Sequence, residues 1–91
     1  TYDVQAELQA GIAAVVHVDG TTRPHVVHQE TSPRLHAILS AYERLSGLPV
    51  LVNTSFNAHE EPIVCTPRDA IKSLKAGRID VLVMADFVVF P

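Results

Sequence analysis

The sequence predicts a small domain of the α/β (α+β) class with an open sheet, and three observations support this prediction. Two segments begin with a hydroxyl residue followed by proline, Ser32-Pro33 and Thr66-Pro67, and such pairs are typical helix starts. Short runs rich in Val, Ile and Leu alternate with these segments. Strands that alternate with helices favour a partly parallel sheet, so the expected order is hairpin, helix, strand, helix, strand and one further strand.

The N-terminal third predicts a β-hairpin. Residues 1–11 fit either a weakly alternating strand or a short helix, and they stay undecided. Ile12–Val18 is a β-rich run without a breaker, and Asp19-Gly20 is a strong turn dipeptide. A second strand is expected over Thr22–His28, at an edge or a bulge because it contains Pro24.

The segment after Pro33 is the strongest helix prediction. Its apolar residues recur at helical spacing, at Leu35, Ile38, Leu39, Tyr42 and Leu45. Gly47 can adopt the left-handed conformation that ends a helix, and Pro49 prevents continuation.

The C-terminal half predicts a short buried strand, a second helix and a final pair of strands. The strand is Val50–Val52, and the helix runs from Thr66-Pro67 to a stop at Gly77. Val81–Met84 is the next strand, Ala85-Asp86 is a turn, and Phe87–Phe90 is a last strand or a docked tail.

Composition limits the classes of protein. Ninety-one residues form at most one domain, so we treat 1–91 as a single domain. A hydrophobic fraction of 47% is high for so short a chain and suggests surface covered by another domain or by a homo-oligomer partner. A net charge of −3 without a basic block argues against nucleic-acid binding.

The sequence also bears on where the protein is found. No apolar run approaches the ~20 residues that span a bilayer. One cysteine cannot form an internal disulfide, which fits a reducing cytoplasm. Because the chain does not begin with Met, we expect a portion of a longer protein.

The main candidate site is Asn53-Thr54-Ser55-Phe56-Asn57, which follows the predicted strand Val50–Val52. Ligands of open α/β sheets bind beyond the carboxyl ends of strands, and these hydroxyl and amide groups suit a neutral or anionic ligand. The alternative is a turn in which the same side chains bind their own backbone.

Other candidates also have two interpretations. Arg23 could hold a phosphate as a bidentate donor, or it could be a solvated edge-strand charge. Cys65 lies before a helix start, where a thiol can be activated as a nucleophile, although its apolar neighbours favour a buried, inert residue. His59 and the adjoining glutamates could act as acid or base, or form a solvated turn. The five histidines show no metal-ligand spacing, so no metal site is expected in this chain.

Two strings resemble the C-terminal signature of the NodU/CmcH-type O-carbamoyltransferases, which act in nodulation-factor and antibiotic biosynthesis. They are Leu51-Val52-Asn53-Thr54-Ser55-Phe56-Asn57 and Glu61-Pro62-Ile63-Val64-Cys65-Thr66-Pro67-Arg68-Asp69-Ala70. Upstream, Val16–Pro24 resembles that family's hairpin. The resemblance extends from about Ile12 to Phe90 and implies part of a YrdC-like domain with a twisted open sheet.

The resemblance also implies site residues. Ser55-Phe56-Asn57 matches a Ser-x-Asn pair of the nucleotide and carbamoyl site, and Arg23 matches an arginine near the phosphate. Asn53 and Thr54 would shape the loop. The family's Lys-x-Arg pair is absent from these residues, and the family's metal-binding acceptor domain is not represented.

The implied activity is carbamoyl transfer. Carbamoyl phosphate and ATP would give carbamoyl-adenylate with loss of phosphate and pyrophosphate, and the carbamoyl group would pass to an acceptor hydroxyl. Arg23 and Ser55 would be the catalytic residues, Asn53, Thr54 and Asn57 would help to bind the substrates, and the metal ion would belong to the other domain. The isolated chain is expected to be inactive. The alternatives are a stand-alone ligand-binding or homodimerising module and a small hydrolase that uses Cys65.

Overall fold

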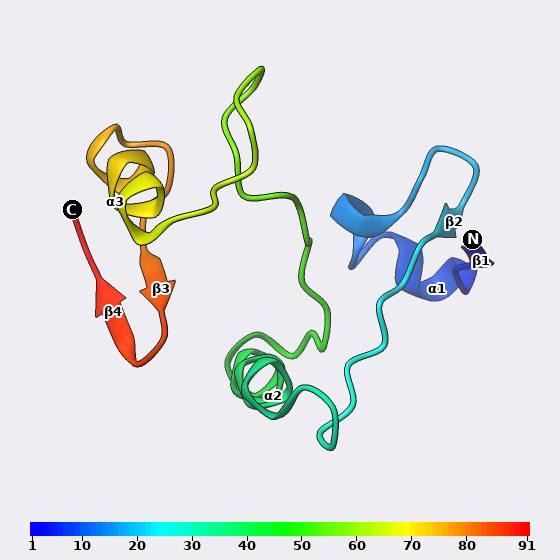
Figure 1. Ribbon diagram of the computed structural model, residues 1–91. Coiled ribbons are helices and arrows are strands. Elements are labelled where there is room, and N and C mark those ends of the chain that lie inside the picture. Colours follow the sequence, from blue (N-terminus) through cyan, green and yellow to red (C-terminus); the bar gives the residue numbers. More distant parts are fainter. The chain divides into compact units, whose positions relative to one another are not determined.

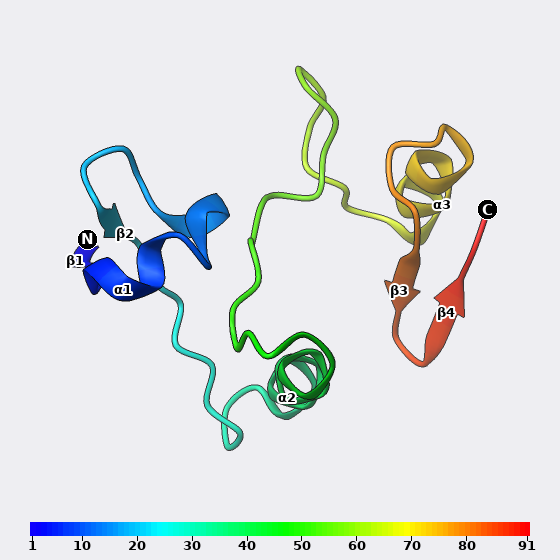
Figure 2. The same cartoon turned by 180° about the vertical axis from the view of Figure 1, so that it is seen from behind.

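The computed structural model describes all residues, Thr1–Pro91. The chain forms two compact units, Thr1–Asn53 and Thr54–Pro91, and each is described by itself. The first unit contains β1 (Tyr2–Asp3), α1 (Ala6–Gln9), a 3-10 helix (Ala13–Val15), β2 (Thr21–Thr22) and α2 (Pro33–Ser46) (Figure 1). The second contains α3 (Pro67–Lys75), β3 (Leu82–Met84) and β4 (Phe87–Val89), which Figure 2 shows from behind.

The first sheet differs from the predicted hairpin. β2 pairs with β1, in an antiparallel ladder that sets Tyr2 opposite Thr22. The prediction of a strand over Ile12–Val18 is wrong, because Ala13–Val15 forms a 3-10 turn whose backbone bonds are local. The Thr22 hydroxyl donates to the Val15 carbonyl at 2.6 Å, which fixes that turn beside β2.

The turn at Asp19-Gly20 is confirmed. Gly20 has φ 81°, and its N–H donates to the His17 carbonyl at 2.9 Å. Asp19 accepts from both the hydroxyl and the N–H of Thr21, at 2.7 and 3.0 Å. Both hydrogen bonds from Thr21 lower the pKa of the Asp19 carboxyl, and the bond from the hydroxyl has the larger effect. A tight turn therefore forms where the sequence predicts one, although its flanks do not form the expected hairpin.

The prediction for α2 is confirmed at both ends. Pro33 occupies the first helical turn, and Gly47 closes the helix at φ 77° with its N–H donating to the Glu43 carbonyl at 2.8 Å. Ser32 precedes the helix as expected, although its side chain makes no capping hydrogen bond.

Val50–Val52 forms no strand and is not buried, so the predicted buried strand is wrong. The segment instead lines a groove of about 330 Å³ in the first unit, together with Gly11–Val15, Tyr42 and Leu48. Its apolar side chains contribute to this groove rather than to a sheet interior.

The second unit follows its predicted order closely. Thr66 caps α3 through a reciprocal pair of bonds: its hydroxyl accepts from the Asp69 N–H at 3.2 Å, and the Asp69 carboxylate accepts from the Thr66 N–H at 3.0 Å. β3 and β4 form an antiparallel hairpin with Val83 opposite Val88, and Ala85 adopts φ 51° at the turn. The turn and the last strand are therefore confirmed.

The buried core belongs to the second unit. Ala70, Leu74 and Leu82 are its buried apolar residues. Around them pack Phe56, Val64, Ile79, Met84 and Val89. Phe56 lies inside the candidate motif, so the loop that carries Ser55 and Asn57 is anchored on this core.

The chain is a mixed α/β fold, as predicted, but its two sheets are each two-stranded and antiparallel. The parallel pairing expected from the alternation of helices and strands is wrong. The YrdC-like order stays a prediction.

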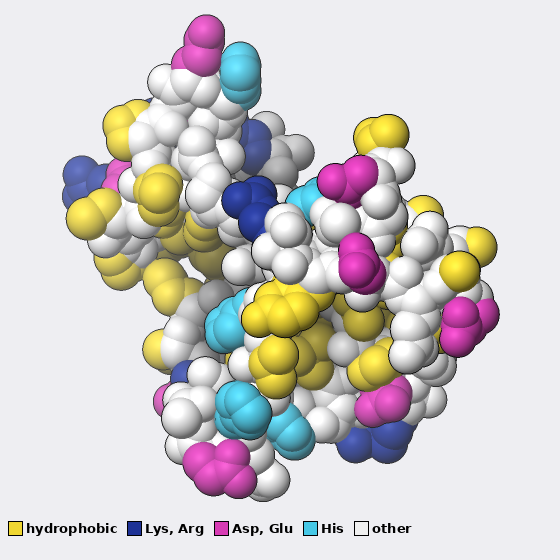
Figure 3. All heavy atoms as spheres, turned by 90° about the vertical axis from the view of Figure 1, so that its right-hand side faces the viewer, with side chains coloured by type: hydrophobic (Ala, Val, Ile, Leu, Met, Phe, Trp, Pro, Cys, Tyr) yellow, Lys and Arg dark blue, Asp and Glu magenta, His cyan; other side chains and the backbone are white.

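Many large apolar side chains remain exposed. Yellow hydrophobic groups are visible on the face displayed in Figure 3. Phe87 and Phe90 are both 68% exposed and Val83 is 61% exposed. None of the helices has the length and apolar character needed to cross a bilayer.

Candidate functional site

The loop between residues 54 and 64 doubles back on itself. The Asn57 N–H donates to the Ser55 carbonyl at 3.2 Å, and the Glu61 N–H donates to the Ala58 carbonyl at 3.0 Å. The Val64 N–H then donates to the Phe56 carbonyl at 2.8 Å and joins the two arms of the loop. This backbone places Ser55 and Asn57 on either side of the anchored Phe56.

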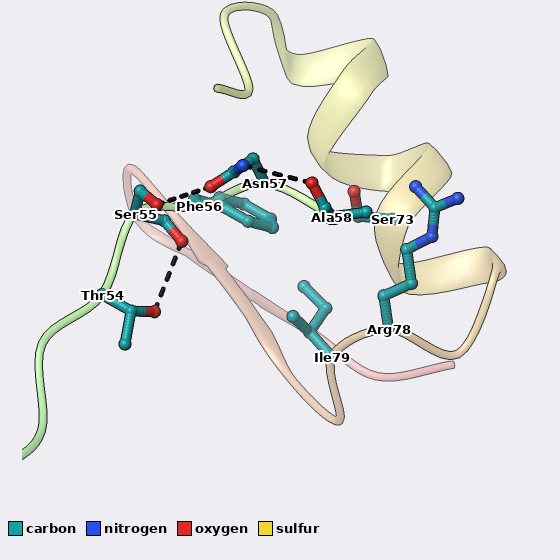
Figure 4. Close-up of a pocket in the computed structure, with 8 residues that line it drawn as sticks. All are labelled: Thr54, Ser55, Phe56, Asn57, Ala58, Ser73, Arg78 and Ile79. Atoms are coloured by element: carbon teal, nitrogen blue, oxygen red, sulfur yellow. Dashed lines mark hydrogen bonds between the residues drawn. The ribbon is translucent and has the colours of Figure 1, made fainter. Parts of the chain in front are cut away.

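The polar side chains of this loop bond to one another and to the loop's own backbone (Figure 4). The Ser55 hydroxyl donates to Oδ1 of Asn57 at 2.5 Å. Nδ2 of Asn57 donates to the carbonyls of Ala58 and Glu61, at 3.1 Å each. The Thr54 hydroxyl donates to the Ser55 carbonyl at 3.3 Å. The self-bonding expected of a polar turn is therefore present, and Asn57 is its centre.

This bonding defines the chemistry that Ser55 can offer. A serine hydroxyl has one proton and two lone pairs, and here the proton is directed at Asn57. Oγ of Ser55 can therefore accept a hydrogen bond from a ligand N–H. Asn57 sets the direction of the Ser55 hydroxyl while its own amide protons hold the loop closed.

A pocket of about 310 Å³ lies beside the loop, and its lining comes from the second unit. The lining residues are Thr54, Ser55, Phe56, Asn57, Ala58, Ser73, Arg78 and Ile79. Figure 4 shows that the loop supplies the first five, whereas the other three come from α3 and the segment that follows it. Ser73 is buried at 6% exposure, whereas the loop residues Thr54, Ser55 and Asn57 of the same lining are exposed. Hydroxyl, amide and guanidinium groups thus share one pocket.

Arg78 forms a bidentate ion pair with Glu61. Nη1 and Nη2 donate to Oε2 and Oε1 at 2.6 and 3.0 Å, although both side chains are partly exposed. The hydrogen bonds from Arg78 hold the pKa of the Glu61 carboxyl below its usual range, and the same bonds raise the pKa of Arg78. The pair joins the loop to the end of α3.

Of the predicted site residues, the structure brings Thr54, Ser55 and Asn57 together. Arg23 and Asn53 belong to the first unit. Arg23 is exposed and directly follows β2. Its proposed role at a phosphate stays a prediction.

Two neighbouring candidates also have defined surroundings. The expectation that Cys65 is buried is wrong, because the thiol is exposed one residue before the cap of α3. His59 and Glu60 are 96% and 87% exposed with 4.0 Å between Nε2 and Oε1, which fits the solvated-turn interpretation. Glu61 differs from both, since its carboxylate is held by Arg78.

Metal ligands do not gather in this chain. No group of three or more His, Cys, Asp or Glu side chains could hold a metal ion. The metal ion that the resemblance implies would belong to the acceptor domain, and its presence there stays a prediction.

Neither Arg78 nor Ser73 was predicted from the sequence as a site residue. Arg78 follows Gly77 at the end of a helix, where a cation is expected on electrostatic grounds alone. Its partner Glu61 lies 17 residues away, and no local pattern pairs the two. Ser73 lies within the helical pattern, so only the observed burial identifies it as a pocket residue.

The comparisons with known proteins agree with the motif. The family described as "Carbamoyltransferase C-terminus" matches residues 1–90. An uncharacterized protein from Synechocystis sp. is 47% identical over 85% of this chain, which corresponds to 12% of the relative. Nodulation protein NolO from Bradyrhizobium diazoefficiens is 40% identical over 86% of the chain and 14% of its own length. A 3'-hydroxymethylcephem-O-carbamoyltransferase from Amycolatopsis lactamdurans is 34% identical over 85% of the chain and 15% of its own length.

No solved structure matches this chain. The matched region spans less than a sixth of each of these relatives. The family match nevertheless covers nearly every residue, including the loop that carries Ser55 and Asn57. The chain therefore belongs to the carbamoyltransferase C-terminus family.

Proposed function

We propose that this chain supplies part of the carbamoyl-phosphate and ATP site of an O-carbamoyltransferase. The observation that carries the proposal is the Ser55 hydroxyl, oriented by Asn57 at the edge of a pocket, in a chain that belongs to this family. The relative named as an O-carbamoyltransferase supports the same class of reaction.

The proposed reaction has two stages. In the first, carbamoyl phosphate, ATP and one water give carbamoyl-adenylate, phosphate and pyrophosphate: the carbamoyl–phosphate bond is hydrolysed, and a carbamate oxygen attacks the α-phosphorus of ATP as pyrophosphate leaves. In the second, an acceptor hydroxyl attacks the carbamoyl carbon and AMP leaves, with the hydroxyl proton passing to solvent or to a base. The protein's contribution is to bind and orient charged substrates.

The geometry supports a specific role for Ser55. Its proton is directed at Asn57, so its oxygen would accept from the carbamoyl NH₂ rather than donate to a phosphate oxygen. Such a contact orients the carbamoyl group without adding charge. Thr54 shapes the same edge of the pocket through its bond to the Ser55 carbonyl.

Arg23 would supply the positive charge. A guanidinium offers a planar set of donors that matches phosphate, and Arg23 is exposed in the first unit. In the proposed site it stabilises charge on the phosphate groups, while Asn53 helps to shape the loop.

The rest of a longer carbamoyltransferase would complete the site. This chain matches 12–15% of the named relatives, and its exposed apolar side chains offer surface for further domains to cover. We therefore expect the isolated 91 residues to be inactive. The same exposed surface would also suit the alternative, a stand-alone homodimerising module. Sedimentation of the isolated chain would detect such a homodimer.

The experiment is carbamoyl-phosphate-dependent exchange of label between pyrophosphate and ATP. The full-length protein that contains this chain should catalyse it, and the isolated 91 residues should not. Omission of carbamoyl phosphate is the control. A full-length protein that transfers carbamoyl groups without ATP would overturn the proposed chemistry, and exchange by the isolated chain would overturn its inactivity.

A further inference from the structure

Four residues of the second unit form a continuous series of contacts, which passes through both the carboxylate and the backbone carbonyl of Glu61. The Arg78 guanidinium binds the Glu61 carboxylate in two places. The Glu61 carbonyl accepts from Nδ2 of Asn57, and Oδ1 of Asn57 accepts from the Ser55 hydroxyl. Every link is a hydrogen bond within one compact unit.

The Arg78 end of this series is fixed in the fold. The Arg78 N–H donates to the carbonyl of the buried Ser73 at 3.1 Å, and the next residue, Ile79, packs against the core. The Ser55 end lies on an exposed loop. Phe56 and Val64 pack against the same core at the two arms of the loop, and the ion pair adds a further attachment at Glu61.

We infer that Arg78 and Glu61 are positioning residues, which hold the loop so that Asn57 accepts the Ser55 proton and leaves Oγ of Ser55 able to accept a hydrogen bond from a ligand. This inference rests on the proposed function for its effect on catalysis. Its structural part, that the pair orders the loop, stands on the contacts alone.

A direct role for Arg78 in binding phosphate is the competing interpretation, because Arg78 also lines the pocket. The bidentate pair argues against it, since both terminal nitrogens already donate to Glu61. The two interpretations predict opposite effects of Glu61→Gln. If Arg78 positions the loop, this substitution weakens the ion pair and loosens the loop. If Arg78 binds phosphate, the same substitution frees Arg78 to bind the substrate.

The test uses full-length enzyme with Arg78→Met, Glu61→Gln, the double variant and the charge swap Glu61→Arg/Arg78→Glu. Lys75→Met, at an exposed cation of α3, is the matched control. We expect each single variant to lower kcat/KM for carbamoyl phosphate by roughly two- to fivefold, because a partly exposed ion pair contributes a free energy of that size. The double variant should be no worse than either single variant, and the swap should recover part of the loss.

Hydrogen–deuterium exchange gives the readout that does not depend on catalysis. The amides of Asn57, Glu61 and Val64 should exchange faster in both single variants than in the parent enzyme. Their exchange rates should be unchanged in Lys75→Met. Unchanged exchange at these amides would overturn the inference, and so would tighter carbamoyl-phosphate binding by Glu61→Gln. If Ser55→Ala retains full activity while the loop amides respond as expected, the proposed function fails and the structural part stands.

Discussion

The Ser55 hydroxyl donates to Oδ1 of Asn57 at 2.5 Å, and the Asn57 amide donates in turn to two carbonyls of the same loop. One amide side chain thus fixes both the direction of a hydroxyl and the shape of the loop that carries it. The turn and binding interpretations of this motif are therefore compatible, because the turn is what orients the serine.

Asn57→Asp tests this dual role. A carboxylate keeps acceptors for the Ser55 hydroxyl but lacks the two donors, and it faces the carbonyls of Ala58 and Glu61. We expect the loop to lose about 1 kcal/mol of local stability for the hydrogen bonds removed. Limited proteolysis between residues 54 and 64 measures the loss. Equal cleavage rates for Asn57→Asp and the parent protein would contradict this account.

The cap of α3 gives a second prediction. Thr66→Ala removes the hydroxyl that accepts from the Asp69 N–H, and loss of such a cap costs about 1 kcal/mol. That cost corresponds to roughly fivefold faster hydrogen exchange of the α3 amides. Thr66→Ser keeps the hydroxyl and serves as the control. A Thr66→Ser variant that exchanges as fast as Thr66→Ala would show that the hydroxyl is not the cap.

The lowered pKa of Glu61 predicts a pH dependence. A carboxyl whose folded pKa lies below its unfolded value stabilises the fold above the unfolded pKa, and this contribution disappears as pH falls through the folded pKa. The loop amides, corrected for intrinsic exchange, should therefore lose protection under acidic conditions. Glu61→Gln should flatten this part of the profile, and Glu60→Gln, at a solvated neighbour, should leave it intact. A profile that responds equally to both substitutions would contradict the assignment to Glu61.

Arg23 carries a prediction about charge. Arg23→Ala in the full-length enzyme should lower carbamoyl-adenylate formation by roughly 100-fold or more, as expected when a group that stabilises developing charge is lost. Arg23→Lys should recover only part, because an ammonium lacks the planar fork. Arg68→Ala, at an exposed arginine of α3, is the control. Circular dichroism should show all three variants folded, and unfolding of Arg23→Ala would mean that the residue is structural.

Local signals predicted α2 and α3 well. The hydroxyl-proline starts of α2 and α3 and the glycine after α2 depend on residues within one turn, so the sequence contains what is needed. The Asp19-Gly20 and Ala85-Asp86 turns are local for the same reason.

Strand pairing was predicted less well, because it depends on distant partners. Ile12–Val18 has β-rich composition, but β2 pairs with Tyr2–Asp3 instead, and the apolar run turns into a 3-10 helix. Propensity for a strand cannot specify which segment will supply the ladder. The Arg78–Glu61 pair escaped prediction for the same reason, whereas the Ser55–Asn57 contact lies within three residues and was accessible as a motif.

The central claim is that Ser55 contacts the carbamoyl group, and Ser55→Ala in the full-length enzyme tests it most directly. Carbamoyl-phosphate-dependent exchange of pyrophosphate into ATP should fall by roughly tenfold or more, the effect of losing one hydrogen bond of about 1.4 kcal/mol. Ser32→Ala, whose side chain makes no capping bond, should keep the parent rate. A folded Ser55→Ala enzyme with the same rate as Ser32→Ala would contradict the account.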